Sequence, residues 1–428
     1  MAITIGIVAL IFFLALGMPV AFALCVSGSI GLIWAEGIQG MMAILITSPF
    51  RTAASFILIT VPMFILMAEI ASIGGLAKEL FVLALRWVGH LPGGLAMATM
   101  VANAGFGAMS GSSTAAAATM SRIAIPEMLN HGYNRVIASG TVAMGGTLAI
   151  MIPPSVPLVV YGITTETPIG KLLIAGILPG ILTTIFYCFG IYLWVKLKPE
   201  LVRPIRPFSW RQRWEALKGL IPFLCLVLVV IGGMYSGLAT PSEVAALGAL
   251  GSLIICVVMR RIDFRGFVLA LERTVKATSM IFAIIIGAMI FGYFSTVTGS
   301  TQKMIESVGI LAIPPWAILF VLIIIYIILG CFMDQMAILL LTLPLTFPLV
   351  VSLGYNPIWF GIIITALVEI GLVTPPFGMN VYVVGTVSGI PLHDIFKGAI
   401  VFLIFEGVAF IFLLFFPIIS LFLPSLMR

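Results

Sequence analysis

Long apolar stretches separated by short polar segments dominate this chain of 428 residues. An apolar helix of about 20 residues crosses a bilayer, so the pattern predicts an all-α polytopic membrane protein. The first run contains Gly17, Met18 and Pro19, which can split it into two helices. Apolar runs suited to helices lie near 3–33, 52–73, 93–108, 114–129, 135–163, 170–196, 216–235, 242–259, 274–297, 314–330, 335–352, 357–386 and 396–424.

The apolar runs in two neighbouring pairs are too short to cross a bilayer. The polar string SGSST at 110–114 separates the first pair, and Asp334 and Gln335 separate the second pair. Helices of roughly 16 residues reach only about 24 Å at a rise of about 1.5 Å per residue. Each pair is therefore predicted to form a re-entrant hairpin, over 93–130 and 314–352, with a polar tip at mid-depth.

The chain repeats itself at a constant offset of 222 positions. The offset aligns Gly132, Tyr133 and Asn134 with Gly354, Tyr355 and Asn356, and it aligns the diproline at 153–154 with that at 375–376. Prolines, glycines and turn residues at matching positions indicate a true internal repeat. The expected division is an N-terminal scaffold (1–51), a first repeat (52–196), a basic cytoplasmic loop (197–214), scaffold helices (215–273) and a second repeat (274–428).

Within the repeats, further elements can be placed. The amphipathic segment 76–90 (LAKELFVLALRWVGH) is predicted to be an arm helix lying flat at the membrane surface, although an ordinary connector stays possible. A broken transmembrane helix is expected in each repeat, over 135–163 and 357–386, because a diproline interrupts each of these runs.

Composition and charge agree with a membrane protein. Hydrophobic residues make up 62% of the chain and charged residues 8%, against about 25% charged residues in soluble domains. The net charge of +6 comes from 21 Lys and Arg against 15 Asp and Glu, but the basic residues form no patch, so a nucleic-acid partner is not expected. The five cysteines lie in apolar runs without a CxxC pair, which predicts neither a disulfide nor a metal thiolate.

The distribution of basic residues orients the chain. If 197–214 is cytoplasmic and the two pairs are hairpins, 74–92, 131–134, 260–273 and 387–395 fall on the same side. All Lys and Arg residues then lie at or near that side except Arg51, Lys171, Lys303 and Arg428, as the positive-inside rule requires. The hairpins then enter from opposite sides, so the repeats are inverted, which is typical of secondary transporters.

The interrupted helices suit a cation and an anion together. Each diproline removes two amide donors, so carbonyl oxygens near 149–152 and 371–374 lose their partners, and Na⁺ is a hard cation suited to such oxygens. The half-helix that follows each break presents free N–H groups, which suit a carboxylate. Two sodium sites, one per repeat, would leave about 5 kcal/mol for the uptake of a monovalent acid, against about 1.4 kcal/mol with one ion.

Polar residues at these interruptions are the first candidates. Ser110, Ser112, Ser113 and Thr114 are interpreted as oxygen ligands or helix caps, or as small residues that let helices pack closely. Asp334 is expected to act on an ion rather than to make only a structural hydrogen bond. The alternatives of ligand and helix packing stay open for Thr147, Glu369 and Asn380, whereas Glu69, Glu243 and Glu406 are expected to be interfacial or structural.

Three strings carry a resemblance to a known family. They are GFGAMSGSSTAAAATMSRIAIPEM (105–128), GYNRVIASGTVAMGGTLAIMIPPS (132–155) and VTPPFGMNVYV (373–383), and they resemble the large membrane subunit of tripartite ATP-independent periplasmic (TRAP) transporters. The resemblance implies a sodium-driven, elevator-type importer in the bacterial inner membrane. It also implies a small membrane subunit and a soluble periplasmic binding protein as partners, and an organic acid as substrate, such as a C4-dicarboxylate or sialic acid (N-acetylneuraminate).

The resemblance also assigns residues to the two sites. The residues expected to bind substrate are Ser112, Ser113, Thr114, Ser155, Gln335 and Asn380. The residues expected to bind sodium are Ser110, Gly145, Gly146, Thr147, Pro153, Gly330, Asp334, Glu369, Thr374 and Pro375.

Two other functions compete with transport. An intramembrane hydrolase would use Ser110, but serine chemistry needs a nearby base, and His90, His131 and His393 all lie at expected loop edges. An ion channel would share the polar tips, but it would leave the opposed hairpins unexplained. The sequence therefore favours a transporter without enzymatic activity.

Overall fold

The computed structural model describes residues 2–203, 205, 207–310 and 313–427. Arg206 and Arg428, which entered the charge pattern, lie outside the described residues. The described part of the chain is helical and contains no strand. Nine of its helices are long and apolar enough to span a membrane, or ten if the bent pair Trp210–Leu217 and Leu220–Tyr235 counts as one span. The prediction of an all-α polytopic membrane protein is confirmed.

The N-terminal part and the first repeat form eleven elements in chain order. They are α1 (Ala2–Ala15), α2 (Val20–Ala53), the 3₁₀ helix η1 (Phe56–Ile59), α3 (Thr60–Ile73), α4 (Leu76–Val88), α5 (Gly94–Ser110), α6 (Ser113–Asn130), α7 (Arg135–Met151), α8 (Val156–Thr165), α9 (Ile169–Ala175) and α10 (Ile177–Leu197).

The remaining elements follow in the same order. They are η2 (Pro199–Leu201), α11 (Trp210–Leu217), α12 (Leu220–Val227), the π-helix η3 (Leu228–Gly232), α13 (Gly233–Tyr235), α14 (Pro241–Val258), α15 (Phe264–Val297), α16 (Ser300–Ile310), α17 (Pro315–Phe332), α18 (Gln335–Ser352), α19 (Pro357–Val373), α20 (Met379–Ser388), α21 (Leu392–Phe415) and α22 (Ile418–Ser425).

Several helices extend beyond the apolar runs that predicted them. The first run splits before Pro19, and α2 then continues to Ala53 with a kink at Gly37, whose φ is 78°. The segment 197–214, expected to be a loop, contains most of α11, which begins with a capping box between Ser209 and Gln212. Helix α15 starts directly after the cap Asp263, before the first apolar residues counted. Hydrophobicity alone misses such ends because polar turns outside the bilayer remain helical when they are capped.

The repeated motif Gly-Tyr-Asn forms the same turn twice. Gly132 and Gly354 adopt φ values of 77° and 86°, which favour glycine. Asn134 caps α7 by accepting the Val136 amide at 2.8 Å, and Asn356 caps α19 in the same way. The motif therefore ends one hairpin and starts the next broken helix in each repeat.

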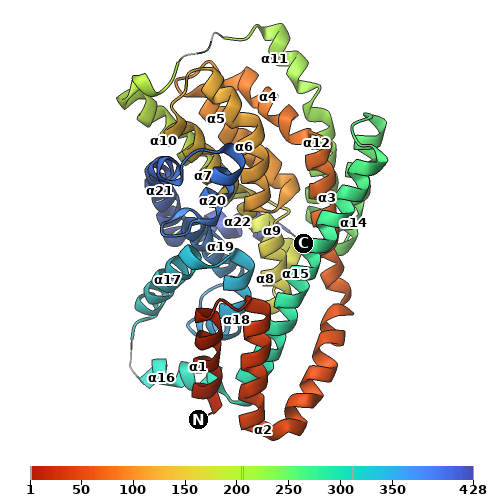
Figure 1. Ribbon diagram of the computed structural model, residues 1–428, viewed down its shortest axis with the longest axis vertical. Coiled ribbons are helices and arrows are strands. Elements are labelled where there is room, and N and C mark those ends of the chain that lie inside the picture. Colours follow the sequence, from red (N-terminus) through yellow and green to blue (C-terminus); the bar gives the residue numbers. More distant parts are fainter. Residues whose placement is uncertain (1, 204, 206, 311–312, 428) are drawn as a thin grey trace.

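The two hairpins occupy opposite halves of the molecule. Figure 1 shows α5 and α6 in the upper half and α17 and α18 in the lower half. Helices α17 and α18 have 18 residues each and count among the nine candidate spans, so length alone does not mark them as re-entrant. Their re-entrant character stays a prediction, and the structure shows their placement opposite α5 and α6.

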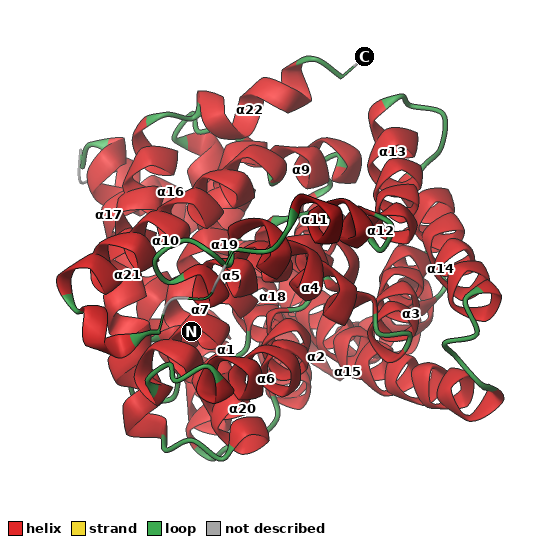
Figure 2. Ribbon diagram, turned by 90° about the horizontal axis from the view of Figure 1, so that it is seen from above, coloured by secondary structure: helices red, strands yellow, loops and turns green. Residues whose placement is uncertain are grey.

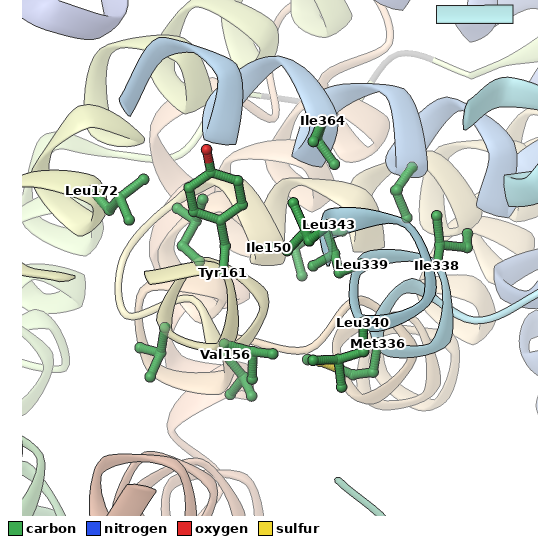
Figure 3. Packing of buried hydrophobic residues seen from close by; sticks show 14 of the residues in the cluster. Ile150, Val156, Tyr161, Leu172, Met336, Ile338, Leu339, Leu340, Leu343 and Ile364 are labelled. Atoms are coloured by element: carbon green, nitrogen blue, oxygen red, sulfur yellow. The ribbon is translucent and has the colours of Figure 1, made fainter. Parts of the chain in front are cut away.

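The scaffold helices pack on one another and also contact the hairpins, where α3 meets α5 and α15 meets α18. Helices α2, α3, α14 and α15 pack together along one side of the bundle (Figure 2). Across the two repeats, α6 packs against α20, and its repeat counterpart α18 packs against α8. Figure 3 shows the second of these contacts, in which Tyr161 of α8 lies in the same buried cluster as Leu339 and Leu343 of α18. Each hairpin is thus held by the half-helix of the other repeat.

Candidate functional site

The first break in the chain separates α7 from α8. Helix α7 ends at Met151, and Pro153 and Pro154 prevent its backbone from continuing. Helix α8 begins after Ser155, whose hydroxyl accepts the Leu158 amide at 3.3 Å. Pro153, Pro154 and Ser155 are buried, so this break lies inside the protein.

The tip of the first hairpin rests directly on this break. The Val156 amide donates to the Gly111 carbonyl at 3.4 Å. A Cβ atom at Gly111 would lie 2.4 Å from the Pro154 carbonyl oxygen, and its φ of 57° also favours glycine. We call the tip 107–114 together with the break 151–155 the first site.

Hydroxyl groups at the first tip have different partners. Ser112 caps α6 by accepting the Ala115 amide at 3.4 Å, and its hydroxyl lies 3.3 Å from that of Thr114. Ser113 donates to the side-chain oxygen of Asn380 at 2.9 Å. The buried hydroxyl of Ser110 has no hydrogen-bond partner among the described residues.

Asn380 connects the two repeats. It follows the second break, lies in α20 and is fully buried. Besides accepting from Ser113, it donates to the Ala143 carbonyl of α7 at 3.4 Å. The structure therefore joins a residue of the first tip to a residue of the second break, both of which were assigned to substrate.

The second break separates α19 from α20. Helix α19 ends at Val373 and α20 begins at Met379. At the neighbouring tip, Asp334 caps α18 by accepting the amides of Met336 at 2.9 Å and Ala337 at 3.2 Å. The tip approaches α19 so closely that a Cβ atom at Gly330 would lie 2.7 Å from the Cα atom of Gly371. We call the tip 330–335 together with the break 374–380 the second site.

A cavity of about 330 Å³ opens beside the second site. The rings of Phe332 and Phe377 form one wall, with centroids 5.7 Å apart. Phe332 is 59% exposed and Phe377 52% exposed, so this cavity opens at the surface of the molecule. The cavity is lined by Gly330, Cys331, Phe332, Met333, Phe377, Met379 and Tyr382.

The remaining candidates lie around these two sites. A Cβ atom at Gly146 would lie 2.9 Å from the Ser113 carbonyl oxygen, so this glycine lets α6 approach α7. Gly145 faces the buried side chain of Asn103, whose amide atoms have no partner in the described part of the chain. Thr374 donates to the Ile370 carbonyl of its own helix. Gln335 Oε1 is buried and has no partner among the residues described.

No hydrogen bond joins Thr147 or Glu369 to a hairpin tip in the described part of the chain. Both are buried, and they share a polar cluster with Tyr187 of α10 and Glu406 of α21. Sequence reasoning missed Tyr187, which no pattern distinguishes from other aromatic residues in spans. It expected Glu406 to be interfacial or structural, and the structure places this residue buried in α21.

Ion pairs outside the spans hold the arm helix in place. Glu79 of α4 pairs with Arg261 in the loop before α15, and this hydrogen bond raises the pKa of Arg261. Arg86 of α4 donates to the Gln212 carbonyl of α11 at 2.8 Å. Two other acidic residues have structural partners, since Glu69 pairs with Arg273 at 3.4 Å and Glu243 accepts the Thr240 amide at 2.7 Å.

Comparisons with known proteins identify similar chains. The family model described as "Tripartite ATP-independent periplasmic transporter, DctM component" matches residues 7–419. The C4-dicarboxylate TRAP transporter large permease protein DctM of Pseudomonas aeruginosa is 36% identical, over 91% of this chain and 93% of that protein. The sialic acid TRAP transporter large permease protein SiaM of Vibrio cholerae is 31% identical, over 87% of each chain.

A solved structure has a similar fold. The crystal structure of the Alcanivorax borkumensis YdaH transporter, described as having an unusual topology, matches with a TM-score of 0.59. The match covers 89% of this chain and 90% of that chain, at 13% sequence identity. This likeness concerns the fold alone.

Proposed function

Because the chain belongs to the DctM component family of tripartite ATP-independent periplasmic transporters, we propose that it imports an organic acid anion together with sodium ions. The observation that carries this proposal is the hydrogen bond of 2.9 Å between Ser113 and Asn380. It joins a hairpin tip of one repeat to the broken helix of the other. Sites of secondary transporters form where such interrupted elements meet.

The proposed sodium ligands are oxygen atoms beside the two breaks. At the first site they are the Ser110 hydroxyl, which has no partner among the described residues, and carbonyl oxygens near the diproline. At the second site they are the Asp334 carboxylate and the carbonyl oxygens of α19 near Thr374. Oxygen donors of these kinds suit a hard cation, and a carboxylate offsets its charge.

The proposed substrate site lies between the tips. Helices α6, α8 and α20 begin at or near Ser113, Ser155 and Asn380, and the N–H groups at helix N-termini favour an anionic group. A carboxylate is therefore expected at these helix ends. The carbon skeleton of the acid fits the cavity lined by Phe332 and Phe377, because buried apolar surface favours binding.

The relatives suggest the kind of substrate and partners. One relative is named for C4-dicarboxylates and another for sialic acid, and both substrates are organic acids. We further propose that this chain works in a bacterial inner membrane with a small membrane subunit and a periplasmic binding protein. The interrupted helices and their hairpins would move as one unit against α2, α3, α14 and α15 in an elevator-type cycle.

Uptake into proteoliposomes tests this proposal. The vesicles contain this chain and its small subunit, and the binding protein and Na⁺ are each withheld in turn. Radiolabelled C4-dicarboxylate, sialic acid and other organic acids are offered separately. Concentrative uptake of one acid that needs both Na⁺ and the binding protein is the expected result, whereas uptake driven equally well without Na⁺ would reject sodium coupling.

A further inference from the structure

The polar cluster of Thr147, Tyr187, Glu369 and Glu406 lies where the two repeats meet. Thr147 and Glu369 occupy equivalent positions, because the repeat offset of 222 takes one to the other. Helices α7 and α19 carry this pair, and α10 and α21 carry Tyr187 and Glu406. All four side chains are at most 2% exposed.

Hydrogen bonds hold part of this cluster. The Thr147 hydroxyl donates to the Met144 carbonyl at 2.6 Å and lies 3.3 Å from the Tyr187 hydroxyl. Tyr187 also interacts with the Glu406 carboxyl group. Its ring is held edge-on against Phe402, with centroids 5.9 Å apart. The hydroxyl of Tyr187 therefore has a defined position beside Thr147.

Three carboxylate oxygens in the cluster have no hydrogen-bond partner within the described part of the chain: both oxygens of Glu369 and Oε2 of Glu406. Neither carboxylate forms an ion pair with a Lys, Arg or His among the described residues. Buried carboxylates without a compensating charge are strongly disfavoured. The cluster therefore needs either a bound cation or a proton on each carboxyl group.

Glu369 and Glu406 lie on α19 and α21, which pack against each other, and the two carboxyl groups interact electrostatically. However, no hydrogen bond links them in the described structure. Two arrangements neutralise such a pair: a proton on each carboxyl group, or one metal ion bound to carboxylate oxygens that do not touch each other. Na⁺ fits the donor set, which consists of carboxylate and hydroxyl oxygens.

We propose that Glu369 and Glu406, with the hydroxyl of Tyr187, bind one sodium ion that is separate from the ions at the hairpin tips. This proposal rests on the proposed sodium-driven transport. None of its ligands belongs to a hairpin tip, so the ion does not depend on residues that contact the substrate. It adds one Na⁺ to the number that the chain binds.

Equilibrium binding of ²²Na⁺ to the full chain in lipid nanodiscs tests the proposal. Glu406→Gln and Glu369→Gln keep the side-chain size and remove the charge. Each single variant and the double variant should lose the same single ion, because all of them remove one site. Glu272→Gln is the matched control, because Glu272 is an exposed residue paired with Lys276, and it should bind as many ions as the wild type.

Tyr187→Phe gives an independent readout if a glutamine variant does not fold. It removes one oxygen ligand without changing the ring, and it should weaken binding of this ion about tenfold. A wild-type chain that binds no Na⁺ would reject the proposed function itself. A wild type that binds Na⁺, with an unchanged ion count in all glutamine variants, would reject only the additional site. If Glu406→Gln binds as many Na⁺ ions as the wild type but one proton fewer, the additional site is also rejected.

Discussion

The first and second sites have the same backbone plan but differ in exposure and chemistry. At the first site the tip is sealed against the break, and Ser113 and Ser155 are both fully buried. At the second site, Phe332 and Phe377 line an open cavity. The first tip carries hydroxyl groups, whereas the second tip carries Asp334 at the position that is equivalent to Ser112 in the repeat. The repeat thus preserves the interruption, and the side chains differentiate the two copies.

The closely packed glycines show the same contrast. In the first repeat, a Cβ atom at Gly107 would lie 2.6 Å from the Cα atom of Ala149. In the second repeat, Gly330 and Gly371 face each other with no side chain between the two backbones. Small residues allow membrane helices to approach this closely. Where Gly330 meets Gly371, the second hairpin therefore approaches α19 by backbone contact, which makes this point sensitive to added side-chain volume.

The largest expected effect comes from making the second tip resemble the first. Asp334→Asn keeps a side-chain oxygen that can cap α18 but removes the negative charge. Because the proposed sodium site then loses its carboxylate, we expect uptake to fall at least tenfold in proteoliposomes, corresponding to about 1.4 kcal/mol or more of coupling energy. Asp334→Ala should abolish uptake.

Thermal unfolding of the same variants separates the two roles of Asp334. The Asp334→Asn variant should retain nearly wild-type stability. The Asp334→Ala variant should lose about 1 kcal/mol of unfolding free energy, because the amides of Met336 and Ala337 lose their acceptor. Normal, sodium-dependent uptake by Asp334→Asn would remove the carboxylate from the ion site and leave it as a cap.

The next effect concerns the contact of the second hairpin with α19. Gly371→Ala would place a Cβ atom 2.4 Å from the Cα atom of Gly330, so the two backbones must separate. We expect destabilisation of about 1–3 kcal/mol, the usual cost of overpacking, together with loss of uptake. Gly407→Ala is the control, because no atom lies within 4 Å of the added Cβ. Equal stability of the two variants, measured by thermal unfolding, would contradict this packing.

A smaller effect is expected where the two sites touch. Ser113→Ala leaves the Asn380 oxygen without its donor, and Asn380→Ala leaves the Ser113 hydroxyl without its acceptor. Each change should cost about 1–3 kcal/mol because the partner stays buried. A double-mutant cycle on stability should give a coupling of about 0.5 kcal/mol or more. Fully additive losses would show that the hydrogen bond contributes nothing to joining the repeats.

The backbone interruptions could be predicted from the sequence because they depend on local chemistry. Diprolines end helices wherever they occur, and α7 and α19 end within two residues of theirs. The Gly-Tyr-Asn turns were equally predictable, since a glycine and an asparagine cap determine the conformation of each turn. Helix α16, which lies at the same offset from α4, was not predicted, because the two segments share no identical residue at this offset.

Contacts between distant residues could not be predicted in the same way. Nothing near Tyr187 or Glu406 in the chain indicates that they meet Thr147 and Glu369, because this proximity arises from the packing of four helices. The partner of Ser113 was hidden for the same reason, since Asn380 lies in the other repeat. The open cavity depends on how Phe332 and Phe377 are oriented, which the apolar pattern does not encode.

The smallest expected effect on stability tests the open wall of the second site. Phe377→Ala removes an aromatic ring that is 52% exposed, so stability should change by only about 0.5 kcal/mol or less. If the ring contacts the carbon skeleton of the acid, the KM for uptake should rise several-fold with little change in maximal rate. This result is expected because the contact stabilises the bound substrate and its transport intermediate alike. Phe56→Ala, at another exposed aromatic residue (66% exposed), should leave the KM unchanged. An unchanged KM in Phe377→Ala would place the substrate away from this cavity and towards the closed first site.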